Sequence, residues 1–191
     1  MPRAGLSPDA VVDVALDLVD EGGAGALTLA AVAGRAGVAT PSLYKHVRNL
    51  TELRALVSIR IMDEISDRAG EAVLGRSGDD ALRALMKAYR SYVVDHPGRY
   101  SAMMQEADPG VVESGRRRIE AGQRLVDIML AALRAYGLEG GEAIHAARSL
   151  RSAAHGFAVL EAAGGFGLPE KLDESYELLI HMVISGLRTP R

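Results

Sequence analysis

The chain has no cysteine and no tryptophan, and aromatic residues make up only 4% of its 191 residues. Without cysteine it can form no disulfide, no thiolate metal site and no cysteine nucleophile. It also lacks an uninterrupted run of the roughly 18 apolar residues that a membrane span needs. Its first ten residues contain no apolar core of signal-peptide length. We therefore expect a cytoplasmic protein whose core is built from aliphatic side chains.

Sequence patterns of known catalytic sites are missing as well. The histidines form no His-Glu-x-x-His pair, and the chain has no P-loop, no dinucleotide-binding glycine motif and no Gly-x-Ser-x-Gly motif. We therefore expect no enzyme, no catalytic residue, no metal and no cofactor. An all-helical enzyme is the alternative, and it would show substrate turnover without salt-dependent DNA binding.

Apolar residues recur at helical spacing along most of the chain, and no segment alternates convincingly with the period of a strand. The pair Ser7–Pro8 is typical of the start of a helix, and Gly22–Gly23 of its end. The pattern predicts an all-α protein. Further helices are expected over residues 50–74, around 82–93, and over 99–106, 108–137, 142–163 and 174–187.

Residues 27–53 read as two short helices joined by a tight turn. Thr28 precedes the first helix as an N-cap, and Gly37 follows it where a left-handed backbone is needed. Thr40 is expected to cap the second helix, with Pro41 at its first position. The spacing is that of a helix-turn-helix, in which a small residue, a glycine and an apolar anchor recur: Ala33, Gly37 and Leu43.

Five basic side chains and one acidic one lie between Thr28 and Arg60, a local net charge of +4 in a chain whose overall charge is −3. This contrast indicates a focused site for a polyanion. The alternative is a solvated polar face on an ordinary helical hairpin. The basic residues are Arg35, Lys45, Arg48, Arg54 and Arg60, and the acid is Glu52.

The run PSLYKHVRN, from Pro41 to Asn49, resembles the DNA-binding domain of the TetR family of transcriptional regulators. The resemblance implies a homodimer of all-helical subunits that binds double-stranded operator DNA. It implies a helix-turn-helix DNA-binding domain of three helices over residues 1–48. A helical domain that binds an effector and dimerises would then cover residues 49–191.

Carried over position by position, the resemblance makes Thr28 and Tyr44 phosphate contacts. His46 and Arg48 would lie near the DNA backbone, and Arg35 joins the expected DNA-binding set through its charge. Lys45 occupies the family's most variable position, so the operator sequence is not implied. The base-facing positions are Thr40, Pro41, Ser42 and Lys45.

Residues Ala154 to Glu170 resemble the branch of the family whose C-terminal domain is named for a Trp-His-Gly motif. Ala154 stands where that motif has tryptophan, while His155 and Gly156 are present. The role of His155 is left open between a polar ligand contact and a structural histidine near the dimer interface.

Small and apolar residues on the last two expected helices predict a four-helix bundle across a two-fold axis. The alternative is that these residues complete the core of the monomer. The expected interface consists of Ala147, Leu150, Ala154, Tyr176, Leu179, Val183 and Leu187.

Methionine and aromatic residues in the C-terminal domain are candidates to line a pocket for a largely apolar small molecule. Ordinary core packing is the alternative for each of them. The basic run Arg116–Arg118 is a solvated face or, alternatively, attracts an acidic effector. The pocket candidates are Tyr100, Met103, Met104, Leu125, Met129, His155, Phe157 and Phe166.

These patterns together predict a ligand-responsive transcriptional repressor that a small molecule releases from a palindromic operator. Two alternatives are a dimeric ligand-binding or scaffold protein that has lost operator binding, and activation in place of repression.

Overall fold

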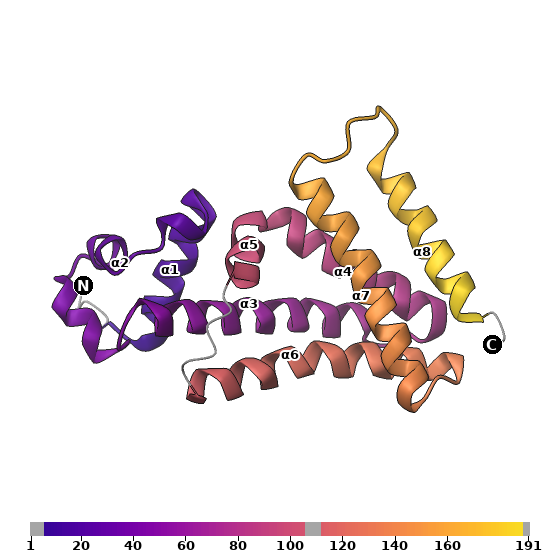
Figure 1. The fold of residues 1–191 in the computed structure, drawn as a ribbon, viewed down its shortest axis with the longest axis horizontal. Coiled ribbons are helices and arrows are strands. Elements are labelled where there is room, and N and C mark those ends of the chain that lie inside the picture. The colour runs from indigo at the N-terminus through magenta and orange to yellow at the C-terminus, as the bar shows by residue number, and fades with distance from the viewer. Residues whose placement is uncertain (1–5, 106–111, 189–191) are drawn as a thin grey trace. The chain divides into compact units, whose positions relative to one another are not determined.

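The computed structural model describes residues 6–105 and 112–188. These residues form helices joined by short connections, with no strand among them, which confirms the all-α prediction (Figure 1). No helix in the described ranges is long and apolar enough to span a membrane. The contacts divide the chain into two compact units, Met1–Asp63 with His96–Gly122, and Glu64–Asp95 with Gln123–Arg191.

The first unit, unit 1, contains the expected helix-turn-helix. Its elements are α1 (Pro8–Gly22), η1 (Ala24–Ala26), α2 (Leu29–Ala36), η2 (Thr40–Lys45), α3 (Leu50–Val73) up to Asp63, α5 (Pro97–Gln105) and the beginning of α6 (Val112–Leu133). Ser7 caps α1 as predicted, because its hydroxyl accepts a 3.1 Å hydrogen bond from the N–H of Ala10. The buried face of α1 consists of Val11, Val12, Ala15, Leu16 and Val19.

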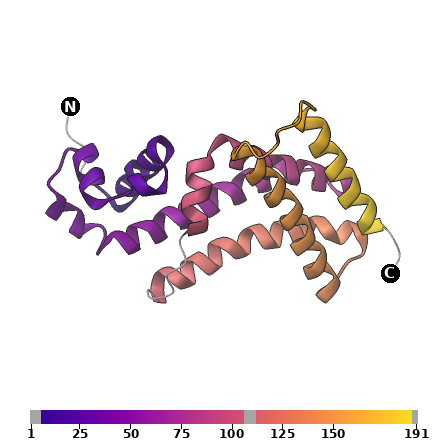
Figure 2. The ribbon, with the colours of Figure 1, turned by 45° about the horizontal axis from the view of Figure 1, so that its top comes forward.

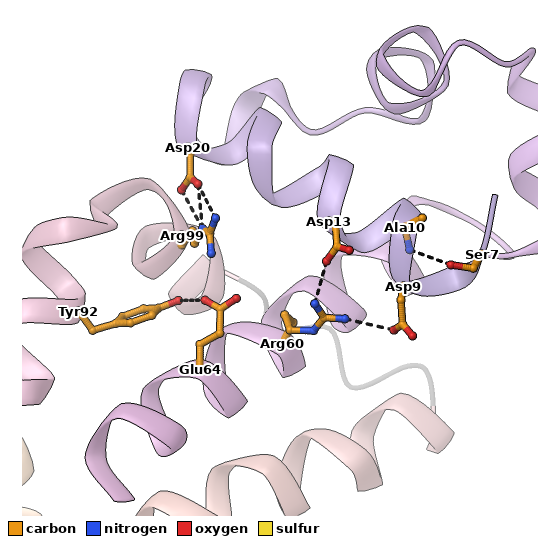
Figure 3. A network of polar contacts seen from close by, with 9 residues as sticks. All are labelled: Ser7, Asp9, Ala10, Asp13, Asp20, Arg60, Glu64, Tyr92 and Arg99. Atoms are coloured by element: carbon orange, nitrogen blue, oxygen red, sulfur yellow. Dashed lines mark hydrogen bonds and ion pairs between the residues drawn. The ribbon is translucent and has the colours of Figure 1, made fainter. Parts of the chain in front are cut away.

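The α5 helix packs closely on the C-terminal end of α1 within unit 1. A Cβ added to Gly98 would lie 2.6 Å from the carbonyl oxygen of Val19, so only glycine fits there without displacing backbone. Next to it, the guanidinium of Arg99 donates hydrogen bonds of 2.6–3.0 Å to the carboxylate of Asp20 (Figure 3). Close packing and a charged pair thus hold α5 against α1.

The second unit, unit 2, contains the rest of α3 and α6 together with α4 (Gly78–Asp95), η3 (Arg134–Tyr136), α7 (Gly140–Ala162) and α8 (Leu172–Arg188). In this unit, α4 contacts both α7 and α8. The α7 and α8 helices lie next to each other and are joined by residues 163–171 (Figures 1 and 2). On the other side of α4, the Tyr92 hydroxyl donates a 2.7 Å hydrogen bond to Glu64 of α3 (Figure 3).

The α7 helix turns its small residues toward the interior of unit 2. Its buried side chains are Ala143, Ala146, Ala147, Leu150, Ala154 and Ala158. Small side chains allow two helices to approach closely, and the helix that approaches here is α4. The small-residue stripe therefore builds the core of the unit.

Candidate nucleic-acid interface

The α2 helix begins and ends as the sequence predicts. The Thr28 hydroxyl accepts a 3.1 Å hydrogen bond from the N–H of Ala31. Gly37 has φ = +68° and closes the helix through the carbonyl groups of Ala33 and Gly34. Thr28 therefore fixes where α2 begins, and Gly37 fixes where it ends and where the turn toward the second helix begins.

The second helix of the motif differs from the prediction at its first residue. It is the 3₁₀ helix η2, in which Ala39 is the N-cap and Thr40 is already the first helical residue. The Thr40 side chain makes no capping hydrogen bond. Pro41 follows in the first turn, where its missing N–H is tolerated. The fully buried side chain of Leu43 anchors this helix in the core of unit 1.

The side chains expected to contact DNA lie on the open surface of unit 1. Tyr44 has 57% of its surface exposed, and Thr28, Pro41 and Lys45 are also exposed. Thr40, Ser42 and His46 are partly exposed. A short helix that presents hydroxyl, phenol and ammonium groups to solvent suits contacts with phosphates and base edges.

The start of α3 is locked by a reciprocal capping arrangement. The Asn49 side-chain oxygen accepts a 2.8 Å hydrogen bond from the N–H of Glu52, so Asn49 is the N-cap of α3. The Glu52 carboxylate in turn accepts hydrogen bonds from the Arg48 backbone N–H at 2.5 Å and from its Nε at 3.0 Å. The hydrogen bond from the Arg48 side chain lowers the pKa of Glu52. Arg48 is therefore already engaged by the protein.

Two more basic residues of the predicted cluster are neutralised by α1. Arg35 pairs with Glu21 at 2.5 Å. Arg60 pairs with Asp13 at 2.8 Å and with Asp9 at 3.1 Å (Figure 3). The local charge of +4 therefore overstates the free positive charge, because the neutralising carboxylates precede the segment that was counted. Among the described residues, no ion pair engages Lys45 or Arg54.

The candidate effector-pocket residues are divided between the two units. Tyr100, Met103 and Met104 belong to unit 1, and the others belong to unit 2. In unit 2, Phe157 contacts Phe166 and Tyr176, with ring centroids 4.8 Å apart in both pairs. The other candidates in unit 2 are Leu125, Met129 and His155.

A charged cluster that sequence reasoning missed lies beside these aromatic rings. Arg90 of α4 donates to both carboxylate oxygens of Glu161 on α7, at 2.6 and 2.7 Å. A third hydrogen bond, 2.7 Å long, reaches Asp173 on α8. The guanidinium also lies over the rings of Phe157 and Tyr176. Arg90 thus joins three helices, and its partners are too distant in sequence for any local pattern to reveal them.

A surface cavity of about 570 Å³ lies next to this cluster within unit 2. Its wall includes Arg90, Glu161 and Asp173 together with Lys87 and Glu177. Both basic side chains are paired with carboxylates. The cavity is therefore lined by charges that compensate one another.

Four of the expected dimer-interface side chains are already buried within unit 2: Ala147, Leu150, Ala154 and Tyr176. The other three, Leu179, Val183 and Leu187, are partly exposed. The apolar side chains that α7 and α8 expose are others: Ile144, Val159, Leu160, Leu178 and Met182. His155 is partly exposed, and burial together with the nearby Arg151 charge lowers its pKa.

Both parts of the chain match known regulator families. Residues 11–55 match the family described as bacterial regulatory proteins, tetR family. Residues 82–183 match the family described as tetracyclin repressor-like, C-terminal domain. Neither description names the Trp-His-Gly branch, so that finer resemblance stays a prediction.

Individual proteins resemble the chain over most of its length. The uncharacterized HTH-type transcriptional regulator Rv0681 of Mycobacterium tuberculosis is 39% identical, over 84% of this chain and 72% of that protein. The uncharacterized HTH-type transcriptional regulator YobS of Bacillus subtilis is 34% identical, over 97% of this chain and 95% of that protein. A solved protein of unknown function from Rhodococcus sp. RHA1 shares the fold, with a TM-score of 0.84 at 22% identity, over 99% of this chain and 100% of that one.

Proposed function

Since this chain belongs to the tetR family of bacterial regulatory proteins, we propose that it is a homodimeric repressor that a small molecule releases from a palindromic operator. That it is a DNA-binding transcriptional regulator follows from the family itself. Repression is favoured because the C-terminal family is described as repressor-like. The observation that carries the proposal is the exposed surface of η2, where the side chains of Tyr44 and Lys45 are open to solvent.

The proposed DNA contacts follow the exposure of these side chains. Thr28 and Tyr44 would donate hydrogen bonds to phosphate oxygens, and His46 would lie near the backbone. Thr40, Pro41, Ser42 and Lys45 would face base edges in the major groove. Among these four base-facing residues, Lys45 carries a full charge. It would therefore contribute both electrostatic attraction to the duplex and sequence preference.

We place the dimer contact on the outward faces of α7 and α8. Both helices pack on α4, so the faces turned away from α4 are open to a partner. Leu178 and Met182 of α8, with Ile144 and Val159 of α7, supply the apolar surface. A two-fold axis through this surface would pair two copies of η2 for half-sites about one helical turn apart.

Release from DNA is proposed to be a shift between two arrangements of the dimer. A ligand that prefers the arrangement that does not bind DNA lowers the operator affinity. The largest possible reduction is the ratio of the ligand's affinities for the two arrangements. The apolar residues and the aromatic group around Phe157 favour a largely apolar ligand.

The proposal is tested by operator selection. The purified protein is mixed with random and genomic duplexes, bound DNA is sequenced, and binding is repeated across a salt series. We expect a palindrome to be enriched, with log affinity falling steeply against log salt. Absence of enrichment, with only weak binding at low salt, would contradict operator recognition. It would favour a ligand-binding or scaffold dimer, which mass spectrometry of bound molecules would then characterise.

A further inference from the structure

We propose that Arg54, on the second turn of α3, is a phosphate contact that acts together with Lys45. The inference rests on the proposed function and deepens it. It distinguishes Arg54 from other arginines of unit 1 that look equivalent in the sequence but are paired with carboxylates in the structure.

The other arginines near the helix-turn-helix are held by carboxylates of unit 1. Arg60 lies between Asp9 and Asp13 and is two-thirds buried. Arg35 makes a two-point contact with Glu21. An arginine in such a pair must lose its protein partner before it can neutralise a phosphate, so it adds little to DNA affinity.

Arg54 differs from these arginines in having no such partner. Its neighbours Leu53 and Ala55 are buried, whereas Arg54 itself is exposed. No carboxylate among the described residues is paired with it. The nearest acid in sequence, Glu52, is occupied by the backbone and side chain of Arg48. The Glu52 carboxylate is therefore already bound to Arg48.

The direction of the helix carries this charge toward the beginning of α3, which is the end that follows η2 in the chain. Long side chains on an α-helix lean toward its N-terminus and cover the preceding turn. The guanidinium of Arg54 is therefore carried back toward Leu50 and Thr51, at the start of α3. The capped corner at Asn49 separates that turn from η2 by only a few residues. A duplex seated on η2 would then meet Lys45 and Arg54 along one strand of phosphates.

Three variants test this inference on the full-length protein: Arg54→Gln, Arg54→Lys and Arg134→Gln. The last is a control on η3, where Arg134 is exposed and belongs to unit 2. Binding is measured by fluorescence anisotropy across a salt series, with the selected operator and with an unrelated duplex. Far-UV circular dichroism checks that each variant is folded.

Each phosphate contact contributes about 0.9 to the slope of log affinity against log salt. A dimer loses one such contact in each subunit, so we expect Arg54→Gln to reduce the slope by about 1.8. The reduction should be the same on both duplexes, because phosphate contacts carry no sequence information. Arg54→Lys should keep the slope, since the charge stays, and Arg134→Gln should match the unmodified protein.

An unchanged slope for folded Arg54→Gln would overturn the inference while leaving the proposed function intact. A loss confined to the selected operator would overturn it too, because that result would indicate a base contact. If the unmodified protein shows no salt-dependent binding to any duplex, the proposed function fails and the inference fails with it.

Discussion

The guanidinium of Arg35 on α2 forms two hydrogen bonds with the carboxylate of Glu21 on α1, of 2.9 and 2.5 Å. The hydrogen bond from Arg35 lowers the pKa of Glu21, and the same bond raises that of Arg35. The contact joins the first helix of the motif to the helix behind it. A side chain that sequence assigns to the DNA surface therefore braces the DNA-binding unit internally.

Arg35→Gln should leave the salt dependence of DNA binding unchanged. Loss of one phosphate contact in each subunit of a dimer would lower the slope by about 1.8, but Arg35 is already neutralised by Glu21. We expect a slightly lower melting temperature, because the pair is exposed and screened by salt. Anisotropy across a salt series and thermal unfolding measure the two quantities. A slope lowered by about 1.8, one phosphate contact for each subunit, would show that Arg35 leaves Glu21 to bind DNA.

Gly98→Ala should destabilise unit 1 by about 1–3 kcal/mol, as overpacked sites do. The added Cβ would lie 2.6 Å from the Val19 carbonyl oxygen, so backbone must move. The free energy of unfolding from urea titrations measures the effect. The matched control is Gly34→Ala within α2, where the added carbon meets nothing within 4 Å. Alanine favours helix there, so this variant should gain about 0.5–1 kcal/mol. Equal stability of the two variants would contradict the close approach of α5 to α1.

Sequence predicts those features of the fold that depend on neighbours in the chain. Ser7, Thr28 and Asn49 each cap a helix by bonding an N–H three residues later, and Gly37 closes α2 in the same local way. Thr40 shows the limit of such reasoning. Its residue type suits a cap, but η2 begins one residue earlier than predicted, so that Ala39 is the N-cap and Thr40 is already helical. Leu43 of the same helix is fully buried in the core.

Side-chain partners that are distant in sequence could not be predicted. The acids that neutralise Arg60 lie on another helix, and neither local spacing nor a charge count pairs them. The α7 helix shows the same difficulty for packing. It has a small-residue face around Ala147 and an apolar face around Ile144, and spacing alone does not decide which one meets α4.

Arg90→Ala should destabilise unit 2 by about 1–3 kcal/mol. Arg90 and Glu161 are only 16% and 13% exposed, so removing the guanidinium leaves a largely buried carboxylate without its partner. The loss should fall below the roughly 3–5 kcal/mol of a fully buried pair, because some solvent reaches the site. Arg90→Lys keeps the charge but not the two-point geometry and should recover only part of the stability. Full recovery with lysine would show that the hydrogen-bond geometry is unimportant.

Stability should fall as pH drops below about 6.5, the ordinary pKa of histidine, and His155 should contribute to this fall. Burial and the Arg151 charge lower the pKa of His155 in the folded state. The unfolded chain therefore takes up this proton at a higher pH than the folded protein does. The stabilisation is complete above about pH 6.5 and is lost as the pH falls through the folded pKa.

The pH effect is isolated by comparing the unmodified protein with His155→Gln at equal concentrations, from pH 8 to pH 5. The difference in their free energies of unfolding should be constant at high pH. Below about pH 6.5 the free energy of unfolding of the unmodified protein should fall relative to that of the variant. His145→Gln, an exposed position on the same helix, is the matched control. A difference that does not vary with pH would contradict the assigned role of burial.

Leu178→Glu should convert the dimer to monomers if the outward face of α8 is the contact. Leu178 is 59% exposed in the single chain, and its neighbour Met182 is 55% exposed, so both have surface left to bury. Burying one leucine side chain contributes about 1.5–3 kcal/mol, and two-fold symmetry counts it twice. Its loss should therefore weaken dimerisation by roughly 10²- to 10⁴-fold, before the cost of burying two carboxylates is added.

Sedimentation velocity over a concentration series measures this change, with Leu74→Glu as control. Leu74 is 81% exposed at the end of α3, away from α7 and α8 in the chain, so its variant should sediment as the unmodified protein does. The Leu178 variant should also bind the selected operator with lower apparent affinity, because two half-sites are then read by separate monomers. If it stays dimeric while Leu179→Glu or Val183→Glu dissociates, the partly exposed flank of α8 is the contact, as the sequence alone predicts.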